Sequence, residues 1–200
     1  MSERSGPDRR KDEETIRTFV CIEVPETIRG RIASLQQELR GGDAQVSWVK
    51  PSNIHLTIKF LGDVAASKIE NIRLAVERAA NPINKFEIEV GGAGCFPAPR
   101  NPRVLWVGLA NLPESLKQLH VRIEDELARE GFEREAKRLS PHLTIGRVRA
   151  PKGASRVAED LIARGFVPER FEAREVIVMR SDLNPKGSIY TPQAAIPFKD

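Results

Sequence analysis

The sequence predicts an α+β fold built from two lobes related by a pseudo-two-fold axis. Strand-like and helix-like segments are intermixed, with hairpin-like neighbours as well as crossovers, which favours α+β over a doubly wound parallel sheet. The order strand, helix, strand, helix occurs twice, and each round delivers the tetrapeptide His-Leu-Thr-Ile, beginning at His55 and at His142. We therefore expect two lobes with antiparallel sheets around a central cleft, and the two motif strands near its centre.

The first half of the chain contains three expected strands and two expected helices. Alternating and β-branched residues indicate the strands. Apolar residues at helical spacing indicate the helices, the first of which ends at Gly41 and Gly42. The expected strands are 18–24, 47–49 and 54–61, and the expected helices are 26–40 and about 67–80.

The second half of the chain has similar parts. The clearest helix carries Leu116, Leu119, Ile123 and Leu127 on one face, with Gly131 just past its end. The expected strands are 86–90, 104–109, 143–148, 175–180 and 189–191, and the expected helices are 113–129 and 154–164.

The ends of the chain and its composition suggest the domain organisation. Residues 1–16 are charged and lack an apolar cluster, so we expect a disordered tail before one bilobal domain at 17–200. No apolar run is long enough to span a membrane and no secretory leader is evident, which indicates a cytoplasmic protein. Two cysteines, Cys21 and Cys95, are too few for a disulfide framework, and we expect both to be reduced. The formal charge of +4 leans toward polyanionic partners.

The repeated tetrapeptide places matching side chains on one face of each motif strand. Side chains alternate along a strand, so His55 and Thr57 point one way and the two aliphatic residues point the other. The same alternation pairs His142 with Thr144. If the pseudo-two-fold axis brings the strands together, two imidazoles and two hydroxyls line one cleft.

This set of side chains suits phosphodiester chemistry. In-line cleavage needs a base at the entering oxygen and an acid at the leaving oxygen, and histidine can give or take a proton near neutral pH. Threonine hydroxyls can donate to the non-bridging oxygens. A zinc site usually needs a third or fourth protein ligand, which the motifs lack, so we expect no metal. The third histidine, His120, falls on a helix and is expected at the surface or its boundary.

The doubled motif resembles that of the two-histidine phosphoesterase superfamily, and within it the RNA 2′,3′-cyclic phosphodiesterase family, also called 2′-5′ RNA ligase-like. The resemblance runs from about Arg17 to Phe198. Besides the two tetrapeptides it includes Arg17-Thr-Phe-Val-Cys-Ile-Glu-Val-Pro25, Pro102-Arg-Val-Leu-Trp-Val-Gly108 and Tyr190-Thr191.

The resemblance implies two βαββ-like halves and metal-independent hydrolysis of RNA or nucleotide 2′,3′-cyclic phosphates to 2′-phosphates. It implies that His55 donates a proton to the leaving 3′ oxygen and that His142 is the base that activates water. Thr57 and Thr144 would hold the phosphate. No cofactor is implied, and the expected partner of this hydrolase is an RNA with a cyclic phosphate end, or a cyclic nucleotide, bound to a monomer.

Three further residues are candidates for substrate binding because of their place along the motif strands or the first strand. Lys59 continues the alternation of His55 and Thr57, which would put it on the open face. Arg147 falls on the opposite face unless Gly146 bends its strand. Phe19 could stack on a base, although core packing is the more usual role for such a residue.

Three more candidates lie outside the motif strands. Arg103 and Trp106 follow a proline-containing loop that could reach a ligand, although a tryptophan within a strand usually packs in the core. Tyr190 could line the cleft.

Two other functions remain open at this point. The same histidines could join RNA ends through a 2′-5′ bond, the reverse of cleavage. Alternatively, the basic α+β halves could form a non-catalytic RNA-binding module. The recurrence of both His and Thr argues against binding alone, which does not need two titratable groups.

Overall fold

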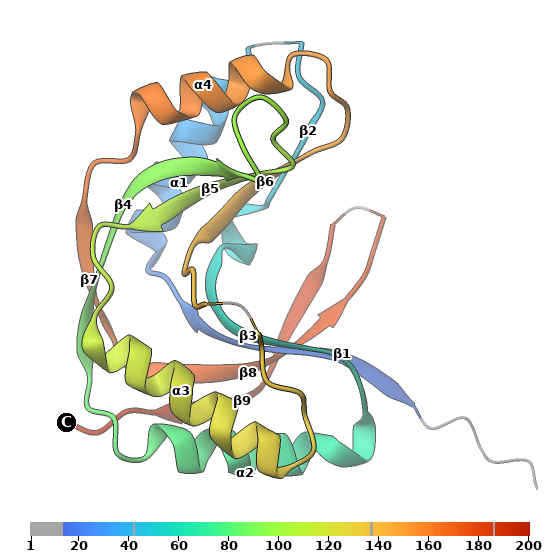
Figure 1. Cartoon of the computed structure of the whole chain (residues 1–200), viewed down its shortest axis with the longest axis vertical. Coiled ribbons are helices and arrows are strands. Elements are labelled where there is room, and N and C mark those ends of the chain that lie inside the picture. Colours follow the sequence, from blue (N-terminus) through green and yellow to red (C-terminus); the bar gives the residue numbers. More distant parts are fainter. Residues whose placement is uncertain (1–13, 42, 137, 186) are drawn as a thin grey trace, which may run out of the picture.

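In a computed structural model of the protein, the described residues form one curled antiparallel sheet of nine strands with four α-helices (Figure 1). The structure describes residues 14–41, 43–136, 138–185 and 187–200. The strand order is β7-β4-β5-β6-β3-β1-β8-β9, with β2 paired to β6. Along this order, four strands lie on each side of the junction between β3 and β6, and β2 adds a fifth on the β6 side.

We call the two sides of this junction the His55 half and the His142 half. The strands of the His55 half are β3 (His55–Ala65), β1 (Thr15–Glu23), β8 (Glu175–Asp182) and β9 (Ile189–Pro197). The strands of the His142 half are β6 (Leu143–Val148), β5 (Val104–Leu109), β4 (Phe86–Phe96), β7 (Glu169–Ala173) and the short β2 (Val46–Trp48).

Each half carries its own pair of helices. Helices α2 (Ile69–Ala80) and α3 (Glu114–Arg129) pack on each other and on the strands of the His55 half. Helices α1 (Glu26–Leu39) and α4 (Ala154–Arg164) pack on the His142 half, at the other end of the molecule (Figure 1). Short 3₁₀ turns at Pro51–Asn53 and Ala66–Lys68 flank β3.

The helices interlock the two halves. Helix α1 follows β1 of the His55 half but packs in the His142 half, and α3 follows β5 of the His142 half but contacts β3. Both begin with the same dipeptide, Pro25-Glu26 and Pro113-Glu114, in which proline occupies the N-cap. The apolar stripe expected on α3 is fully buried, at Leu116, Leu119, Ile123 and Leu127.

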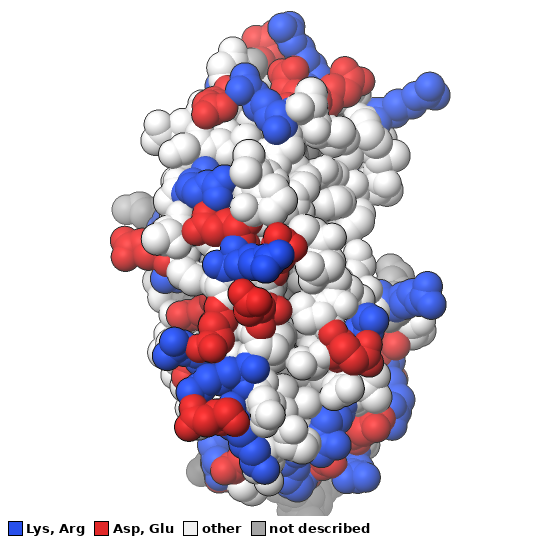
Figure 2. Space-filling view, turned by 90° about the vertical axis from the view of Figure 1, so that its left-hand side faces the viewer, with Lys and Arg blue, Asp and Glu red and all other residues white. Residues whose placement is uncertain are grey.

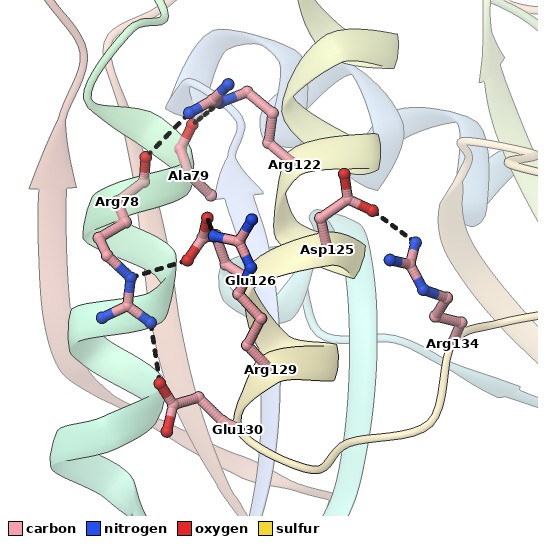
Figure 3. Close-up of polar contacts among 8 residues, drawn as sticks. All are labelled: Arg78, Ala79, Arg122, Asp125, Glu126, Arg129, Glu130 and Arg134. Atoms are coloured by element: carbon pink, nitrogen blue, oxygen red, sulfur yellow. Dashed lines mark hydrogen bonds and ion pairs between the residues drawn. The ribbon is translucent and has the colours of Figure 1, made fainter.

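An ion-pair seam joins α2 to α3 on their outer side (Figure 3). Arg78 of α2 bonds to Glu126 and Glu130 of α3, and Arg122 donates to the backbone carbonyl of Ala79. Within α3, Arg129 also pairs with Glu126. These bonds tie α2 to α3 along the whole of the seam's described length.

The expected elements are present, but several bounds differ. Strand β3 runs to Ala65 and β9 to Pro197, beyond the expected ends at residues 61 and 191. Strand β1 begins at Thr15, so the last residues of the expected tail 1–16 are part of the sheet, and Ile16 is buried. Residues 1–13 of that tail lie outside the described residues. Strand β4 extends to Phe96, beyond the expected end at residue 90. Strand β7 was not expected.

The two motif strands meet at their matching leucines. The pairing of β3 with β6 consists of Leu56 opposite Leu143, and both side chains are fully buried. In an antiparallel pair, a residue that faces its own motif counterpart lies on a two-fold axis between the strands. One residue further along this register, His55 comes opposite Thr144 and His142 comes opposite Thr57.

Candidate active site

All four motif side chains line one cleft of about 330 Å³. His55 and Thr57 enter it from β3, and Thr144 enters from β6, with His142 immediately before that strand. The other described lining residues are Ser47, Trp48, Val49, Lys50, Asn53, Phe60, Phe96, Val104, Arg147, Arg149, Gly187, Ser188 and Tyr190. The expected convergence of the two tetrapeptides on one cleft is therefore what the structure has.

The two imidazoles are held in the same way. Nδ1 of His55 lies 2.8 Å from the backbone carbonyl of Asn53, and Nδ1 of His142 lies 2.8 Å from that of Ser140. A carbonyl oxygen can only accept, so each Nδ1 carries the hydrogen. Each Nε2 is thus left to exchange a proton with a ligand, and the two rings have the same tautomer when neutral.

A bulge follows the threonine in both motif strands. Along β3 the partners of β1 step from Thr57 to Lys59, and along β6 the partners of β5 step from Thr144 to Gly146. In each strand the fourth motif residue, Ile58 or Ile145, is the extra one. A bulge reverses the alternation beyond it, so the sixth residue of each run returns to the cleft face. That residue is Phe60 in one half and Arg147 in the other.

The expectation that Lys59 lies on the open face is wrong, and the bulge at Ile58 is the reason. Lys59 is 2% exposed, and its Nζ bonds to both carboxylate oxygens of Glu124 in α3, at 2.7 and 2.8 Å. It also donates to the backbone carbonyl of Glu133. Lys59 therefore ties the His55 strand to α3 and to the segment that leads to His142, and it cannot reach a ligand in the cleft.

His55 sits in an apolar, largely closed environment. Phe19 stacks on its ring with 4.7 Å between centroids, and Tyr190 meets it edge-on at 5.2 Å. This burial lowers the pKa of His55 from 6.5 to about 4, against the smaller opposing effect of its bond to the Asn53 carbonyl. His55 is therefore neutral at pH 7 when the cleft holds no anion.

His142 has a more open setting. Phe96 meets its ring edge-on at 5.1 Å, and the indole of Trp106 lies 6.4 Å away at a tilt. Arg147 and Arg149 reach the cleft from the same strand and the segment just after it. The positive charge of the cleft is thus concentrated in the His142 half.

The other candidate residues divide between the cleft and its supports. Arg147 and Tyr190 line the cleft. Phe19 is 1% exposed and lies behind the His55 ring, so it cannot stack on a base. Trp106 packs under Phe96 and His142, outside the lining. Arg103 lines a smaller neighbouring hollow.

Gly146 explains how Arg147 reaches the cleft. A Cβ atom at Gly146 would lie 2.8 Å from Val46 and 3.1 Å from the Trp48 ring, so only glycine lets β2 pack this closely on β6. The backbone carbonyl of Ile145, the bulged residue, accepts hydrogen bonds from the Gln36 side chain at 2.8 Å and from the Val49 amide. The sequence did not decide whether the strand bends at Gly146. These contacts show that it does, and they hold the bend in place.

Sequence reasoning missed several residues of the cleft. Lys50, Asn53, Phe60 and Arg149 were not expected there. Arg149 could have been found, because it lies two residues after Arg147 and shares its side of the chain. Strict alternation places Phe60 on the opposite face, because it does not show the bulge at Ile58. No local sequence pattern marks Asn53 as a residue of the cleft. Asn53 nevertheless holds His55 through its carbonyl and binds the backbone of Ser188 through its side chain, at 2.7 Å.

The cleft lining, as far as the structure describes it, contains basic and neutral polar groups but no carboxylate. Among the described residues, no group of three or more His, Cys, Asp or Glu side chains is placed to hold a metal ion. Cys21 and Cys95 are both buried and unpaired, as expected. Two imidazoles, two hydroxyls and two guanidinium groups around one hollow can bind a phosphate and move protons on it.

Comparison with known proteins points to one family. The family model described as LigT like Phosphoesterase matches twice, at residues 22–106 and 107–190. The chain is 38% identical over 178 residues to the RNA 2′,3′-cyclic phosphodiesterase of Methanothermobacter thermautotrophicus, covering 88% of this chain and 95% of the relative. It is 35% identical to the protein of the same name from Archaeoglobus fulgidus, covering 88% and 96%.

Solved structures share the fold. The protein TT0787 of Thermus thermophilus superimposes with a TM-score of 0.76 at 23% identity, over 92% of this chain and 98% of that one. Escherichia coli LigT in complex with 3′-AMP superimposes with a TM-score of 0.75 at 24% identity, over 94% and 100%. No helix among the described residues is long and apolar enough to cross a membrane.

Proposed function

The chain belongs to the LigT-like phosphoesterases, and we propose that His55 and His142 form the acid and base pair of its reaction. It is an enzyme that hydrolyses RNA 2′,3′-cyclic phosphodiesters, the activity for which its curated relatives are named. One observation carries the proposed pair: two imidazoles, bonded through Nδ1 in the same way, line a single cleft across a two-fold axis.

The proposed reaction breaks one phosphorus–oxygen bond and needs no metal. His142 takes a proton from water as the water oxygen attacks phosphorus. The bond to the 3′ oxygen breaks on the opposite side, and His55 gives that oxygen its proton. The products are a 2′-phosphate and a free 3′ hydroxyl. Thr57 and Thr144 donate hydrogen bonds to the non-bridging oxygens, where Arg147 adds a charge-assisted contact.

The role of His55 as acid couples proton uptake to substrate binding. A neutral imidazole has no proton to donate from Nε2, and burial keeps His55 neutral at pH 7 in the free protein by lowering its pKa. An anionic phosphate beside the ring favours the imidazolium form and raises its pKa. The closed apolar setting then strengthens the attraction between the two charges.

The experiment is turnover of adenosine 2′,3′-cyclic phosphate in excess EDTA, with the product identified by phosphorus NMR. We expect the 2′-monophosphate. His55→Ala and His142→Ala should each reduce kcat by about 10²–10⁴-fold, the usual contribution of a general acid or base. His120→Ala is the matched control, because this third histidine lies on α3 outside the cleft.

Three results would contradict the proposal. Loss of turnover in EDTA would refute the metal-independent reaction. Near-normal turnover in either cleft variant would refute the pairing. Release of the 3′-monophosphate would reverse the choice of leaving oxygen. If the wild-type protein forms 2′-5′ bonds from RNA ends and the same variants lose that activity, ligation is the reverse use of the same pair.

We also propose that the protein acts as a monomer in the cytoplasm, with one domain that begins at β1, at Thr15, and not at residue 17. Both candidate catalytic groups come from one chain, so no second copy is needed to complete the cleft. The sheet runs unbroken through both halves, and the helices cross between them. Two buried, unpaired cysteines suit a reducing compartment.

A further inference from the structure

A second hollow adjoins the cleft in the His142 half. It has a volume of about 260 Å³, and Arg149 lines both it and the cleft. Its described lining comes from the connection between β4 and β5 and from the segment that follows β6. Arg103 stands on the first of these, and Arg149 on the second. A continuous path therefore leads from the two imidazoles, over Arg149, to Arg103.

The two arginines are fixed at their backbones and exposed at their side chains. The carbonyl of Arg103 accepts a hydrogen bond from the Val148 amide at 2.9 Å, and the amide of Arg149 donates to the Gln45 carbonyl at 2.7 Å. Nε of Arg149 also donates to the Ser47 hydroxyl at 2.6 Å. Both residues are exposed. The guanidinium group of Arg149 is thus held by Ser47, and the side chains of both arginines are open to a ligand.

Neither arginine has an acidic partner. Within the described parts of the chain, Arg103 and Arg149 form no ion pair, and neither does Arg147 in the cleft. Several arginines elsewhere are paired with a carboxylate, for example Arg170 with Glu89. Figure 2 shows the face on the left of Figure 1, where red acidic side chains lie between the blue basic ones. The uncompensated charge beside the cleft attracts anions.

The hollow on the other side of His55 differs in charge. It has about 280 Å³ and is lined by His55 and Tyr190, but also by Glu23 and Lys50. A carboxylate repels a phosphodiester, and Lys50 only balances it. Of these two neighbouring hollows, the one beside Arg149 therefore suits an RNA backbone better.

We infer that Arg103 and Arg149 bind the phosphodiester on the 5′ side of the cyclic end, so that the enzyme prefers RNA chains to free cyclic mononucleotides. This inference rests on the proposed function. In a 2′,3′-cyclic end both the 2′ and 3′ oxygens belong to the ring, so the chain continues only through the 5′ oxygen. The next phosphate must then lie beside the cleft, and guanidinium groups bind phosphate through two parallel hydrogen bonds.

The test compares two substrates that share the same terminal nucleoside. One is adenosine 2′,3′-cyclic phosphate, and the other is the dinucleotide ApA with a 2′,3′-cyclic end. Arg103→Gln and Arg149→Gln should each lower kcat/KM for the dinucleotide by about tenfold, because one charge-assisted phosphate contact is lost. Mononucleotide turnover by Arg103→Gln should change by less than about twofold, since the mononucleotide has no such phosphate and Arg103 lies outside the cleft lining. Arg149 also lines the cleft, so Arg149→Gln should lower turnover of the dinucleotide more than that of the mononucleotide. Each variant should also reduce the salt dependence of dinucleotide turnover.

Arg156→Gln is the matched control. Arg156 is an exposed arginine on α4 that lines neither the cleft nor the hollow beside it, so its loss removes the same charge without the contact. The inference is overturned if the wild-type protein does not prefer the dinucleotide, or if the two variants affect both substrates equally. In both cases the wild-type protein still hydrolyses the mononucleotide, so the proposed function stands. If the wild-type protein hydrolyses neither substrate, the proposed function is overturned as well.

Discussion

The His55 half and the His142 half share a tetrapeptide, a backbone hydrogen bond to the imidazole and a bulge, but they surround the two rings differently. Phe19, Tyr190 and Phe60 enclose the side of His55, whereas Arg147 and Arg149 enter on the side of His142. The divergence starts directly after the motif, where Lys59-Phe60 of one strand corresponds to Gly146-Arg147 of the other. Symmetry thus supplies two equivalent positions, and the following residues give them different electrostatics.

The same comparison extends to the supports behind the strands. The eleventh residue of α1 is Gln36 and the eleventh of α3 is Glu124, and both are buried polar side chains directed at a motif strand. Gln36 donates to the Ile145 and Val49 carbonyls, each at 2.8 Å. Glu124 accepts from Lys59. One half therefore uses neutral hydrogen bonds where the other uses a buried ion pair.

The largest effect is expected from breaking that ion pair. Lys59→Ala leaves Glu124 charged and buried, which should lower the free energy of unfolding by about 3–5 kcal/mol. Gln36→Ala removes neutral hydrogen bonds and should cost about 1–3 kcal/mol. Urea unfolding of both variants measures the difference. A cost for Lys59→Ala no larger than that for Gln36→Ala would show that the two supports are energetically alike.

A smaller effect is expected from exchanging the residues after the bulges. Arg147→Gln should lower kcat/KM for adenosine 2′,3′-cyclic phosphate by about 10–100-fold, through loss of a charge-assisted contact. Phe60→Leu, at the equivalent position, should change it less than about threefold, because it keeps an apolar side chain there. Steady-state kinetics on the mononucleotide measures both. Equal losses would mean that the cleft does not distinguish its cationic side from its apolar side.

The smallest effect is the contribution of His55 to acid stability. The folded protein holds the pKa of His55 at about 4, below its ordinary value of 6.5. Between these values the unfolded chain takes up a proton that the folded protein refuses, so stability falls as the pH drops from about 6.5 to about 4. His55→Gln should remove about 1–2 kcal/mol of this loss. Urea unfolding at pH 7 and pH 4.5 tests it, and an unchanged difference between the two pH values would contradict it.

Much of this arrangement can be predicted from sequence because local patterns determine it. Strands β5 and β6 and helix α4 have the expected bounds, since alternation or helical spacing and flanking glycine or proline define them. The convergence of the four motif side chains follows from alternation and an internal repeat. Strand β7, Glu169–Ala173, is short, largely polar and at the sheet edge, so its pattern carries no such signal.

What sequence could not predict depends on contacts between distant segments. Lys59 and Arg147 both depart from strict alternation because each strand has a bulge, and a bulge is visible only in the register with its neighbour. Glu124, which buries Lys59, lies on a helix that follows a strand of the other half. The hollow lined by Arg103 and Arg149 likewise joins two segments that are far apart in the chain.

The central claim is that one phosphate lies between the two imidazoles, and a crystal structure with adenosine 2′-monophosphate tests it most directly. We expect the phosphorus between the rings, with Nε2 of His142 within about 2.6–3.2 Å of a phosphate oxygen and Nε2 of His55 at the same distance from the 3′ hydroxyl. Both Nδ1 atoms should keep their bonds to the Asn53 and Ser140 carbonyls. A phosphate that contacts only one imidazole, or binds outside the cleft, would contradict the paired mechanism.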